Sequence, residues 1–321
     1  MRVLVTGASG LLGGTVARLL AQRGDDVVLM QRRPSGLDLP ERLGDLRDPN
    51  DVRSAVRGVD GVIHLAAKVN VVGAWADYVA ANVEGTRTLL DAARGAGVRR
   101  FVHVSSPSVA HAGRSLVAAP AGPADPRAAR GSYSRSKAMA ERIALAAHGP
   151  DMAVVAVRPH LVWGPGDMQL VSRIVERGRS GRLALVGRGT ALIDTTYVDN
   201  AAEALVAALD AAEAAGGEAY VVSNGEPRPV AEILTAICAA AGVRGPRRSV
   251  PFPVAWAAGA AVDGLWSTLR RDDDPPITRF LAEQLATAHW FDQRRTRQAL
   301  GWAPRVGLDE GFARLAAAYP R

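Results

Sequence analysis

The chain has 321 residues, of which 48% are hydrophobic and 22% are charged, as in an ordinary globular protein. Its single cysteine, Cys238, excludes an internal disulfide framework and a cysteine-based zinc cluster, so we expect no metal and a cytoplasmic location. The net charge of +7 comes from scattered arginine pairs rather than a basic stripe, which argues against a nucleic-acid partner. We expect no secretory signal and no transmembrane span, although a peripheral membrane contact stays open.

The first half of the chain alternates apolar runs with amphipathic stretches. The runs predict strands at residues 2–6, 26–30, 61–65, 99–105 and 153–158. Between them, the periodicity predicts helices at residues 11–23 and 78–96. Strands that alternate with helices form a parallel sheet covered on both faces, so we predict a doubly wound α/β fold of the Rossmann type.

Residues 114–131 are rich in Ala, Pro and Gly and predict a long irregular loop, followed by a helix from Ser132 to Ala147. The alternation is less regular after Arg158. There the sequence predicts helices at 169–179, 200–212 and 230–241, and strands at 183–186 and 218–222 that extend the same sheet. We therefore predict one unit over 1–321 with a smaller C-terminal lobe. The cofactor-binding core comprises 1–160 and about 190–223, and the substrate-binding lobe comprises about 161–189 and 224–321.

The segment TGASGLLG, from Thr6 to Gly13, follows the first predicted strand and opens the first predicted helix. There Gly7 allows a tight turn, Gly10 lets a phosphate approach the backbone, and Gly13 permits close packing of the helix. The amides at the helix N-terminus can then bind a dinucleotide pyrophosphate. The glycine spacing alone is weak evidence, but its position between a strand and a helix predicts a dinucleotide site.

The end of the second predicted strand indicates which dinucleotide binds. An acidic residue there usually binds the ribose 2′-hydroxyl of NAD, but this chain has Gln31, Arg32 and Arg33. A carboxylate would repel a 2′-phosphate, whereas an arginine can bind it through paired hydrogen bonds. We therefore predict NADP(H) rather than NAD(H). The alternative is a pair of solvated surface arginines.

Tyr133 and Lys137 are four residues apart, so they share one face of the predicted helix. A nearby ammonium favours the phenolate, which would bring Tyr133 toward the pKa range useful for acid/base catalysis. Lys68 and Lys137 are the two lysines among 39 basic residues, which makes both candidates for a chemical role. Ser105–Ser108 follows the strand at 99–105, where a hydroxyl can hydrogen-bond a reacting oxygen. For the pair of Tyr133 and Lys137, the alternative is a surface lysine on a helix that also carries a buried tyrosine.

Together these residues resemble the extended short-chain dehydrogenases/reductases, the NAD(P)-dependent epimerase/dehydratase family, over nearly the whole chain. The resemblance rests on the order of short motifs: TGASGLLG, GDLRD around Asp45, HLAA at 64–67, ANVEGT around Asn82, VSSPSV, YSRSK, RPHLVWGPG at 158–166 and TTYVDN at 195–200. The resemblance implies an oxidoreductase, and a homodimer joined through the helices at 78–96 and 132–147.

The resemblance also implies the roles of individual residues. Tyr133 is the acid/base group, Lys137 binds the nicotinamide ribose and lowers the tyrosine pKa, and Ser106 orients the substrate oxygen. The residues implied to bind the cofactor are Gly7, Ser9, Gly10, Leu11, Leu12, Gly13, Gln31, Arg32, Asp45, Leu46, Leu65, Ala66, Ala67, Lys68, Asn82, Lys137, Pro159, His160 and Val162.

Within the family, the stretches at 107–111, 158–167, 223–227 and 278–291 are most similar to two groups of enzymes. One group reduces 2-alkyl-3-oxoalkanoates in long-chain olefin synthesis, and the other comprises 3β-hydroxysteroid and sterol-4α-carboxylate 3-dehydrogenases. Because cells keep NADPH for reduction, Gln31 and Arg32 favour a reductase acting on the 3-carbonyl of a long-chain 2-alkyl-3-oxoalkanoate, with hydrocarbon-pathway enzymes as candidate partners. The alternatives are the steroid dehydrogenase, a nucleotide-sugar epimerase or dehydratase, and a non-catalytic NADPH sensor.

A long-chain carboxylate substrate needs a cation and an apolar surface. Lys68 is predicted to contact the carboxylate or the cofactor, with a solvated lysine as the alternative. The apolar segment 252–269 would roof the pocket or touch a membrane or a partner enzyme, although the helical spacing of Val262, Leu265, Trp266 and Leu269 favours a core helix. The other predicted substrate residues are Ser108, His111, Trp163, Trp256 and Trp266.

Overall fold

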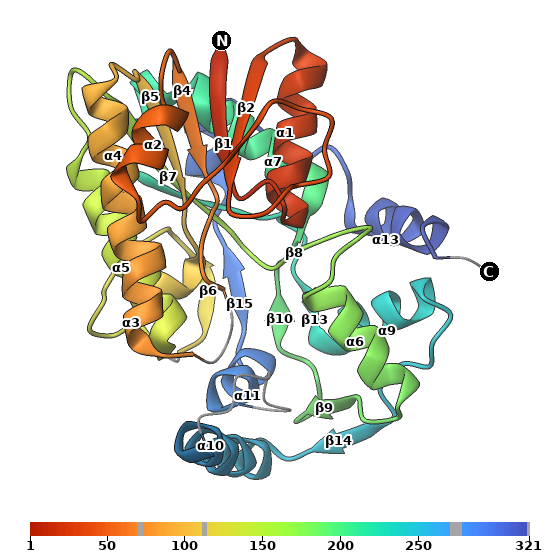
Figure 1. Cartoon of the computed structure of the whole chain (residues 1–321). Helices are drawn as coiled ribbons and strands as arrows, with labels where there is room; N and C mark the ends of the chain where they lie inside the picture. The colour runs from red at the N-terminus through yellow and green to blue at the C-terminus, as the bar shows by residue number, and fades with distance from the viewer. Residues whose placement is uncertain (70–72, 111–113, 270–277, 320–321) are drawn as a thin grey trace.

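The computed structural model describes residues 1–69, 73–110, 114–269 and 278–319, and a seven-stranded parallel sheet forms its centre (Figure 1). The strand order is β12-β7-β5-β4-β1-β2-β3. The order reverses at β1, which has β2 on one side and β4 on the other, and doubly wound sheets bind ligands at such a switch point. The predicted sheet is therefore confirmed. Its strands are β1 (Arg2–Thr6), β2 (Asp26–Gln31), β3 (Glu41–Leu43), β4 (Gly61–His64), β5 (Arg100–Val104), β7 (Ala153–Pro159) and β12 (Ala219–Val222).

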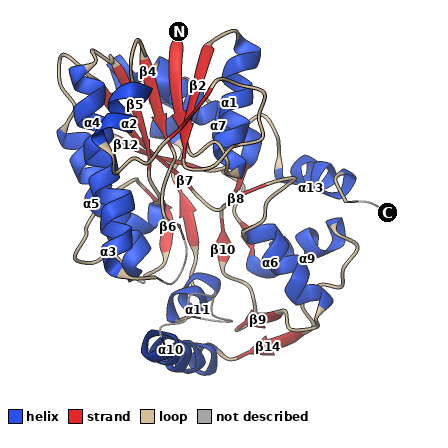
Figure 2. Ribbon diagram, viewed as in Figure 1, coloured by secondary structure: helices blue, strands red, loops and turns tan. Residues whose placement is uncertain are grey.

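Helices cover both faces of this sheet (Figure 2). α1 (Leu11–Arg23) and α7 (Val198–Asp210) cover one face, and α2 (Pro49–Ala55), α4 (Gly85–Gly95) and α5 (Gly131–Ala146) cover the other. Along β1, Val3 and Val5 pack with α1 and α7, whereas Leu4 packs with the opposite group. Since both faces of each central strand are buried, the strands are continuous apolar runs instead of alternating ones.

The helix expected at 78–96 consists of three consecutive pieces. They are α3 (Trp75–Tyr78), a π-helix η1 (Val79–Glu84) and α4. A π turn accommodates an extra residue without ending the helical run, so the apolar periodicity still resembled a single helix. π turns are frequent at functional sites, and this one carries Asn82.

The sequence predicts an irregular loop over the whole of 114–131, but the structure has a strand within this segment. β6 (Leu116–Ala119) pairs with β15 (His289–Phe291), which also pairs with β10 (Leu192–Ile193). With β13 (Arg228–Pro229), these strands form a four-stranded sheet outside the main one. Ala is uncommon in strands, so the Ala-rich composition concealed β6. The sheet connects the segment that follows Ser106 to the C-terminal lobe.

The two later predicted strands belong to different sheets. β12 extends the main sheet beside β7, as expected for residues 218–222. The expectation for 183–186 was wrong, because β9 (Ala184–Val186) pairs with β14 (Arg248–Val250) in a separate two-stranded sheet. A three-residue apolar run predicts a strand but gives no information about its partner.

Among the described residues, no helix combines the length and apolar character that a membrane crossing requires.

The remaining elements complete the lobe and its junction with the core. The elements are the 3₁₀ turn Pro107–Ala110, β8 (Val162–Trp163), α6 (Leu170–Arg179), β11 (Thr196–Tyr197), α8 (Ala212–Ala215), α9 (Val230–Ala240), α10 (Phe252–Leu269), α11 (Arg279–Ala286), α12 (Arg294–Leu300) and α13 (Leu308–Ala317).

α10 does not bury the face that the sequence predicted to be core. Leu265 is 51% exposed, and Val262 and Trp266 are only half-buried, while the side chain of Leu269 lies outside the described residues. The buried side of the helix contains Ala255 and Gly259 instead. Apolar residues occur all round α10, so their spacing could not indicate which side faces the core.

A buried ion pair fixes α5 to the sheet. Arg158 on β7 donates from Nε and Nη2 to the two carboxylate oxygens of Glu141 on α5, at 2.7 and 2.5 Å. Both side chains are fully buried. The remaining guanidinium nitrogen, Nη1, donates to the carbonyl of Ala121 in the loop ahead of α5. One arginine therefore holds the strand, the helix and the loop together.

Candidate active site

Close backbone contacts shape the glycine loop between β1 and α1. Gly7 has a φ of +79°, and a Cβ there would lie 2.8 Å from the amide nitrogen of Ala66. A Cβ on Gly13 would overlap the carbonyl oxygen of Gly7. A Cβ on Gly10 would meet that same oxygen at 3.5 Å and nothing else among the described atoms. Gly7 and Gly13 are thus required by the fold, whereas Gly10 borders open space.

The N-terminus of α1 offers the donors that a pyrophosphate needs. Gly10 is the N-cap, and among the described residues no side chain caps this helix end. The amides of the first turn, which includes Leu11 and Leu12, have no acceptor inside the helix. The open space beside Gly10 and the uncapped positive helix end therefore fit a dinucleotide phosphate.

Gln31 connects the end of β2 to the glycine loop. Its Oε1 accepts the amide of Ser9 at 2.8 Å, and its Nε2 donates to Glu41. Burial opposes ionisation of Glu41, but hydrogen bonds from Ser35 and Gln31 lower the pKa of its carboxyl overall. Arg32 is exposed beyond the strand. A carboxylate that sequence reasoning had not considered is therefore present beside the predicted ribose site.

The cofactor candidates after β3 and β4 lie around the same edge. Hydrogen bonding from Arg47 lowers the pKa of Asp45, and the charge of Arg32 contributes to that shift. Leu46 packs at the start of α4, because a Cβ added to Gly85 would lie 3.2 Å from the Cβ of Leu46. Residues 65–67 are half-buried and follow β4 beside the glycine loop.

His64, at the end of β4, belongs to a buried chain of hydrogen bonds. Its Nδ1 lies 2.7 Å from the hydroxyl of Thr6, which also accepts the amide of Ala66. Its Nε2 lies 3.0 Å from the hydroxyl of Thr86, whose single proton is donated to the carbonyl of Asn82. His64 must therefore donate from Nε2 and accept at Nδ1. Burial lowers the pKa of His64 to about 3, so the ring is neutral, as this arrangement requires.

Asn82 extends this chain to α5. Its Oδ1 accepts the amide of Lys68 at 2.7 Å, and its Nδ2 donates to the carbonyl of Lys68 and to the hydroxyl of Ser136, at 3.1 and 2.9 Å. The hydroxyl of Ser136 then donates to the carbonyl of Tyr133 at 2.8 Å. The π-helix thus links the segment after β4 to the first turn of α5.

Lys137 is buried on α5 and reaches the end of β5. Its Nζ donates to the carbonyl of Val104 at 2.6 Å and lies 3.4 Å from Nε2 of His103. Burial lowers the pKa of Lys137 to about 8, against the attraction of Glu141, so most of the ammonium stays charged at neutral pH. Burial also holds the pKa of His103 well below its ordinary value, so Lys137 faces a neutral ring.

Tyr133 meets Ser106, and the two were predicted to act together. The hydroxyl of Ser106 is near enough to the phenol to lower its pKa, and it lies 2.9 Å from the hydroxyl of Ser108. Burial raises the pKa of Tyr133 to about 12, against this effect of Ser106. This direction is opposite to the expected one, because Lys137 directs its ammonium to Val104 and not to the phenol. At neutral pH the phenol is therefore protonated.

The turn after β7 is strained and firmly held. Pro159 ends the strand, and Leu161 has a φ of +44°, a conformation that costs a residue other than glycine about 1–3 kcal/mol. Thr196 donates its hydroxyl to the carbonyl of His160 at 2.7 Å and its amide to the carbonyl of Leu161 at 3.2 Å. Val162 then begins β8. The predicted cofactor-binding turn is thus fixed at the carboxyl edge of the sheet.

The structure separates the predicted substrate residues. Trp163 is fully buried, stacks on Phe312 with ring centroids 4.6 Å apart and donates to Thr195, so its assignment to the substrate was wrong. Trp256 and Trp266 lie on α10. Lys68 pairs with Asp77 at 3.1 Å, which leaves its predicted carboxylate contact a prediction. His111 lies outside the described residues.

Sequence reasoning missed several members of the hydrogen-bonded chain. His64 and Thr86 lie in the motifs HLAA and ANVEGT and Ser136 lies in YSRSK, but the motifs alone predict no role for any of the three. A signal existed, because a histidine that ends a fully apolar strand and a threonine one turn after Asn82 are polar residues at buried positions.

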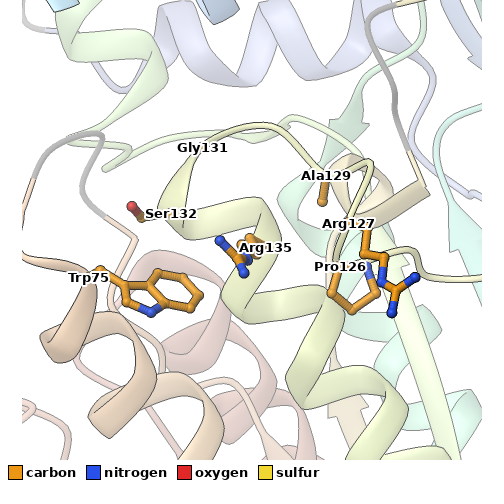
Figure 3. A pocket seen from close by; sticks show the side chains of 7 residues that line it. All are labelled: Trp75, Pro126, Arg127, Ala129, Gly131, Ser132 and Arg135. Atoms are coloured by element: carbon orange, nitrogen blue, oxygen red, sulfur yellow. The ribbon is translucent and has the colours of Figure 1, made fainter.

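A cavity of about 560 Å³ lies beside the first turn of α5 (Figure 3). The guanidinium of Arg135 lies 4.9 Å from the ring centre of Trp75 across it. It contains none of the predicted site residues and therefore does not enlarge the site. It is lined by Trp75, Pro126, Arg127, Ala129, Gly131, Ser132 and Arg135.

A glycine loop at the switch point of a parallel sheet, close to a tyrosine and a lysine one helical turn apart, is the arrangement of an NAD(P)-dependent oxidoreductase of the extended short-chain dehydrogenase/reductase class. Comparison with known proteins gives the same result. Residues 3–223 match the model of the NAD dependent epimerase/dehydratase family, and the chain belongs to this family.

Curated relatives match the chain over almost its whole length. The chain is 42% identical to a 2-alkyl-3-oxoalkanoate reductase of Stenotrophomonas maltophilia, with 99% of each protein covered. It is 30% identical to a 3-beta-hydroxysteroid dehydrogenase of Mycolicibacterium neoaurum, with 97% of this chain and 89% of the relative covered. The solved structure of MoeE5 in complex with UDP-glucose and NAD is similar with a TM-score of 0.75 and 27% identity, over 99% of this chain and 98% of that one.

The glycine contacts predict different effects for two otherwise similar substitutions. Gly10→Ala should leave the melting temperature unchanged, because its Cβ has room, yet raise the Kd for NAD(P)H about tenfold or more, since that space would hold phosphate. Gly13→Ala should lower the melting temperature as well, because its Cβ overlaps the loop backbone. Thermal unfolding and calorimetric titration would measure both. Wild-type affinity in Gly10→Ala would contradict the assignment of the loop.

Proposed function

We propose that this enzyme is an NADPH-dependent reductase that converts the 3-carbonyl of long-chain 2-alkyl-3-oxoalkanoates to a hydroxyl group. The observation that carries the proposal is the 42% identity, over 99% of both chains, to a relative named for this reaction. The relative named as a steroid dehydrogenase is more distant, at 30% identity. Both names describe chemistry at a carbonyl or hydroxyl carbon, which the tyrosine and serine pair fits.

In this proposal Tyr133 is the general acid of the reduction. A nicotinamide cofactor, when bound, supplies a hydride for the carbonyl carbon. The phenol of Tyr133 donates its proton to the carbonyl oxygen as negative charge develops there, so the products are the alcohol and a tyrosinate that regains a proton from solvent. A pKa raised to about 12 suits this direction, because the phenol carries its proton at neutral pH.

Ser106 and Lys137 support that step in different ways. The hydroxyl of Ser106 lies beside the phenol, whose pKa it lowers, and would be a second donor toward the same oxygen. Lys137 would bind the ribose hydroxyls of the cofactor, for which its ammonium has donors beyond the one directed to Val104.

The end of β2 supports NADP(H) as the cofactor. Gln31 replaces the carboxylate that would bind an NAD ribose, and its side chain is already engaged by Ser9 and Glu41. Arg32 is exposed just beyond it and near Asp45, on the side predicted for the adenosine. A 2′-phosphate there would find the guanidinium of Arg32 and an uncharged amide, while the nearby carboxylate of Glu41 is already engaged by Ser35 and Gln31.

The experiment that tests the function is oxidation of a long-chain 2-alkyl-3-hydroxy acid by the purified protein, followed through NADPH absorbance. Turnover with NADP⁺, and reduction of the corresponding 3-oxo acid with NADPH, is the expected result. A 3β-hydroxysteroid with NAD⁺ is the matched alternative substrate. Turnover of the steroid without turnover of the acyclic acid would replace the proposal with the steroid dehydrogenase.

Removing the phenolic hydroxyl tests the assigned acid. Tyr133→Phe should lower kcat about 10²- to 10⁴-fold, the usual contribution of a positioned general acid, while the Kd for NADPH stays constant. Tyr220→Phe is the matched control, because Tyr220 is a buried tyrosine whose hydroxyl bonds only weakly to the carbonyl of Ala215, at 3.3 Å. Unchanged turnover in Tyr133→Phe would remove this residue from the mechanism.

Cofactor preference depends on Arg32. Arg32→Ala should raise the Kd for NADPH about tenfold or more, since a hydrogen bond to a charged group contributes about 1.5–3 kcal/mol, and should leave the Kd for NADH unchanged. Arg57→Ala, another exposed arginine, serves as the control. Equal or tighter binding of NADH by the wild-type protein would show that Arg32 is a solvated surface charge.

A further inference from the structure

The outer face of α10 is apolar along its length. Val254, Ala258, Ala261 and Leu265 follow at helical spacing, and all four are exposed, with Val254 at 57% and Leu265 at 51%. Asp263 is the single charged residue in the sequence of this helix, and it pairs with Arg279 at 3.2 Å. A solvated helix normally turns polar residues outward, so this face needs an apolar covering.

The inner face of α10 is tightly packed, so the helix is not simply misplaced. Ala255 forms a small core with Val186 of β9 and Ala282 of α11. A Cβ on Gly259 would lie 2.6 Å from the amide nitrogen of Arg279, which shows how closely the two helices approach. β9, β14, α10 and α11 therefore form one packed unit at the end of the lobe that lies farthest from the N-terminus (Figure 1).

The same unit carries unpaired positive charge. Residues 177–193 and 241–262 contain no Asp or Glu. Arg182, Arg188, Arg247 and Arg248 in these segments are exposed, and none of them forms an ion pair with another described residue. Since β9 and β14 pair directly and β14 leads into α10, these cations belong to the same packed unit as the apolar face. An apolar surface with exposed arginines in the same unit complements an anionic lipid headgroup layer above acyl chains.

This unit is also connected to the candidate active site. Glu283 on α11 accepts the indole N–H of Trp256 on α10 at 3.2 Å. Its carboxylate also accepts two hydrogen bonds from Arg130, at 2.5 and 2.6 Å, and Arg130 is the N-cap of α5, three residues before Tyr133. Two side-chain contacts thus separate the apolar helix from the helix that carries the proposed acid.

We propose that the outer face of α10, with Arg182, Arg188, Arg247 and Arg248, docks the enzyme on the surface of an anionic phospholipid bilayer, from which a long-chain substrate enters. The substrate part of this proposal rests on the proposed function, because long alkyl chains partition into membranes. The docking part rests on the exposed residues alone. Docking here would be peripheral, with Val254 and Leu265 inserted among the acyl chains and the arginines at the phosphates.

Flotation of the full chain with vesicles tests the docking. The wild-type protein should float with vesicles of equal parts phosphatidylcholine and phosphatidylglycerol, and much less with phosphatidylcholine alone, and high salt should weaken binding. Val254→Asp/Leu265→Asp should reduce the affinity about tenfold or more. Arg247→Glu/Arg248→Glu should abolish the preference for the anionic vesicles.

A matched variant controls for the added charge. Val117→Asp/Met168→Asp introduces the same two carboxylates at apolar residues that are 60% and 79% exposed outside α10, and it should bind vesicles like the wild-type protein. Circular dichroism and turnover of a short-chain, water-soluble 2-alkyl-3-hydroxy acid without vesicles should be equal in all variants. Those readouts show that a loss of flotation is not a loss of folding.

Three results would overturn the docking proposal. They are no flotation of the wild-type protein, equal flotation of Val254→Asp/Leu265→Asp, or a smaller oligomer for that variant in light scattering. The last result would make the face an interface between copies of this chain. A wild-type protein that floats with anionic vesicles but does not turn over any 2-alkyl-3-hydroxy acid would refute the proposed function and leave the docking surface standing.

Discussion

The pair between Arg158 and Glu141 is the contact on which the geometry of the site depends. An arginine and a carboxylate lose much of their hydration when both are fully buried, and the bidentate pair, with the third guanidinium nitrogen bonded to Ala121, offsets that loss. Its geometry therefore tolerates little movement between β7 and α5. Because α5 carries Tyr133 and Lys137, and β7 leads into the strained turn at Leu161, both sides of the proposed nicotinamide site are positioned by one ion pair.

A second constraint crosses the switch point of the sheet. The hydrogen bonds from Thr6 through His64, Thr86 and Asn82 to Ser136 join the end of β1 to α5. Each donor in this chain has one acceptor, and a neutral His64 is the only state that satisfies it. The phosphate end and the proton-donating end of the proposed site thus share a single buried network, which explains why polar residues occupy these core positions.

Much of the fold followed from patterns that depend on local physics. The central strands were predictable because both faces of the sheet are buried, which makes each strand a continuous apolar run. The helix at 11–23 also has the predicted bounds. The partner strands of β9 and of β6, which are β14 and β15, could not be predicted, because the sequence of a short strand does not indicate which strand it pairs with. Trp163 and Leu265 were misplaced for one reason: an apolar side chain suits a core, a substrate pocket or an interface equally well. The pKa of Tyr133 depended on the direction of one ammonium, which spacing does not determine.

The π-helix at Val79–Glu84 has a consequence for how this segment tolerates change. One extra residue in a helical turn rotates everything before it by about 100° relative to everything after it, since an α-helix has about 3.6 residues per turn. Deletion of a single residue here would restore an unbroken α-helix. The side chains of Trp75 and Asp77 would then point in a different direction around the helix axis, while α4 stays in the core. Insertions and deletions of one residue, which elsewhere in a packed helix disturb the whole face, would in this enzyme act mainly on the orientation of Asn82 and of the short helix before it.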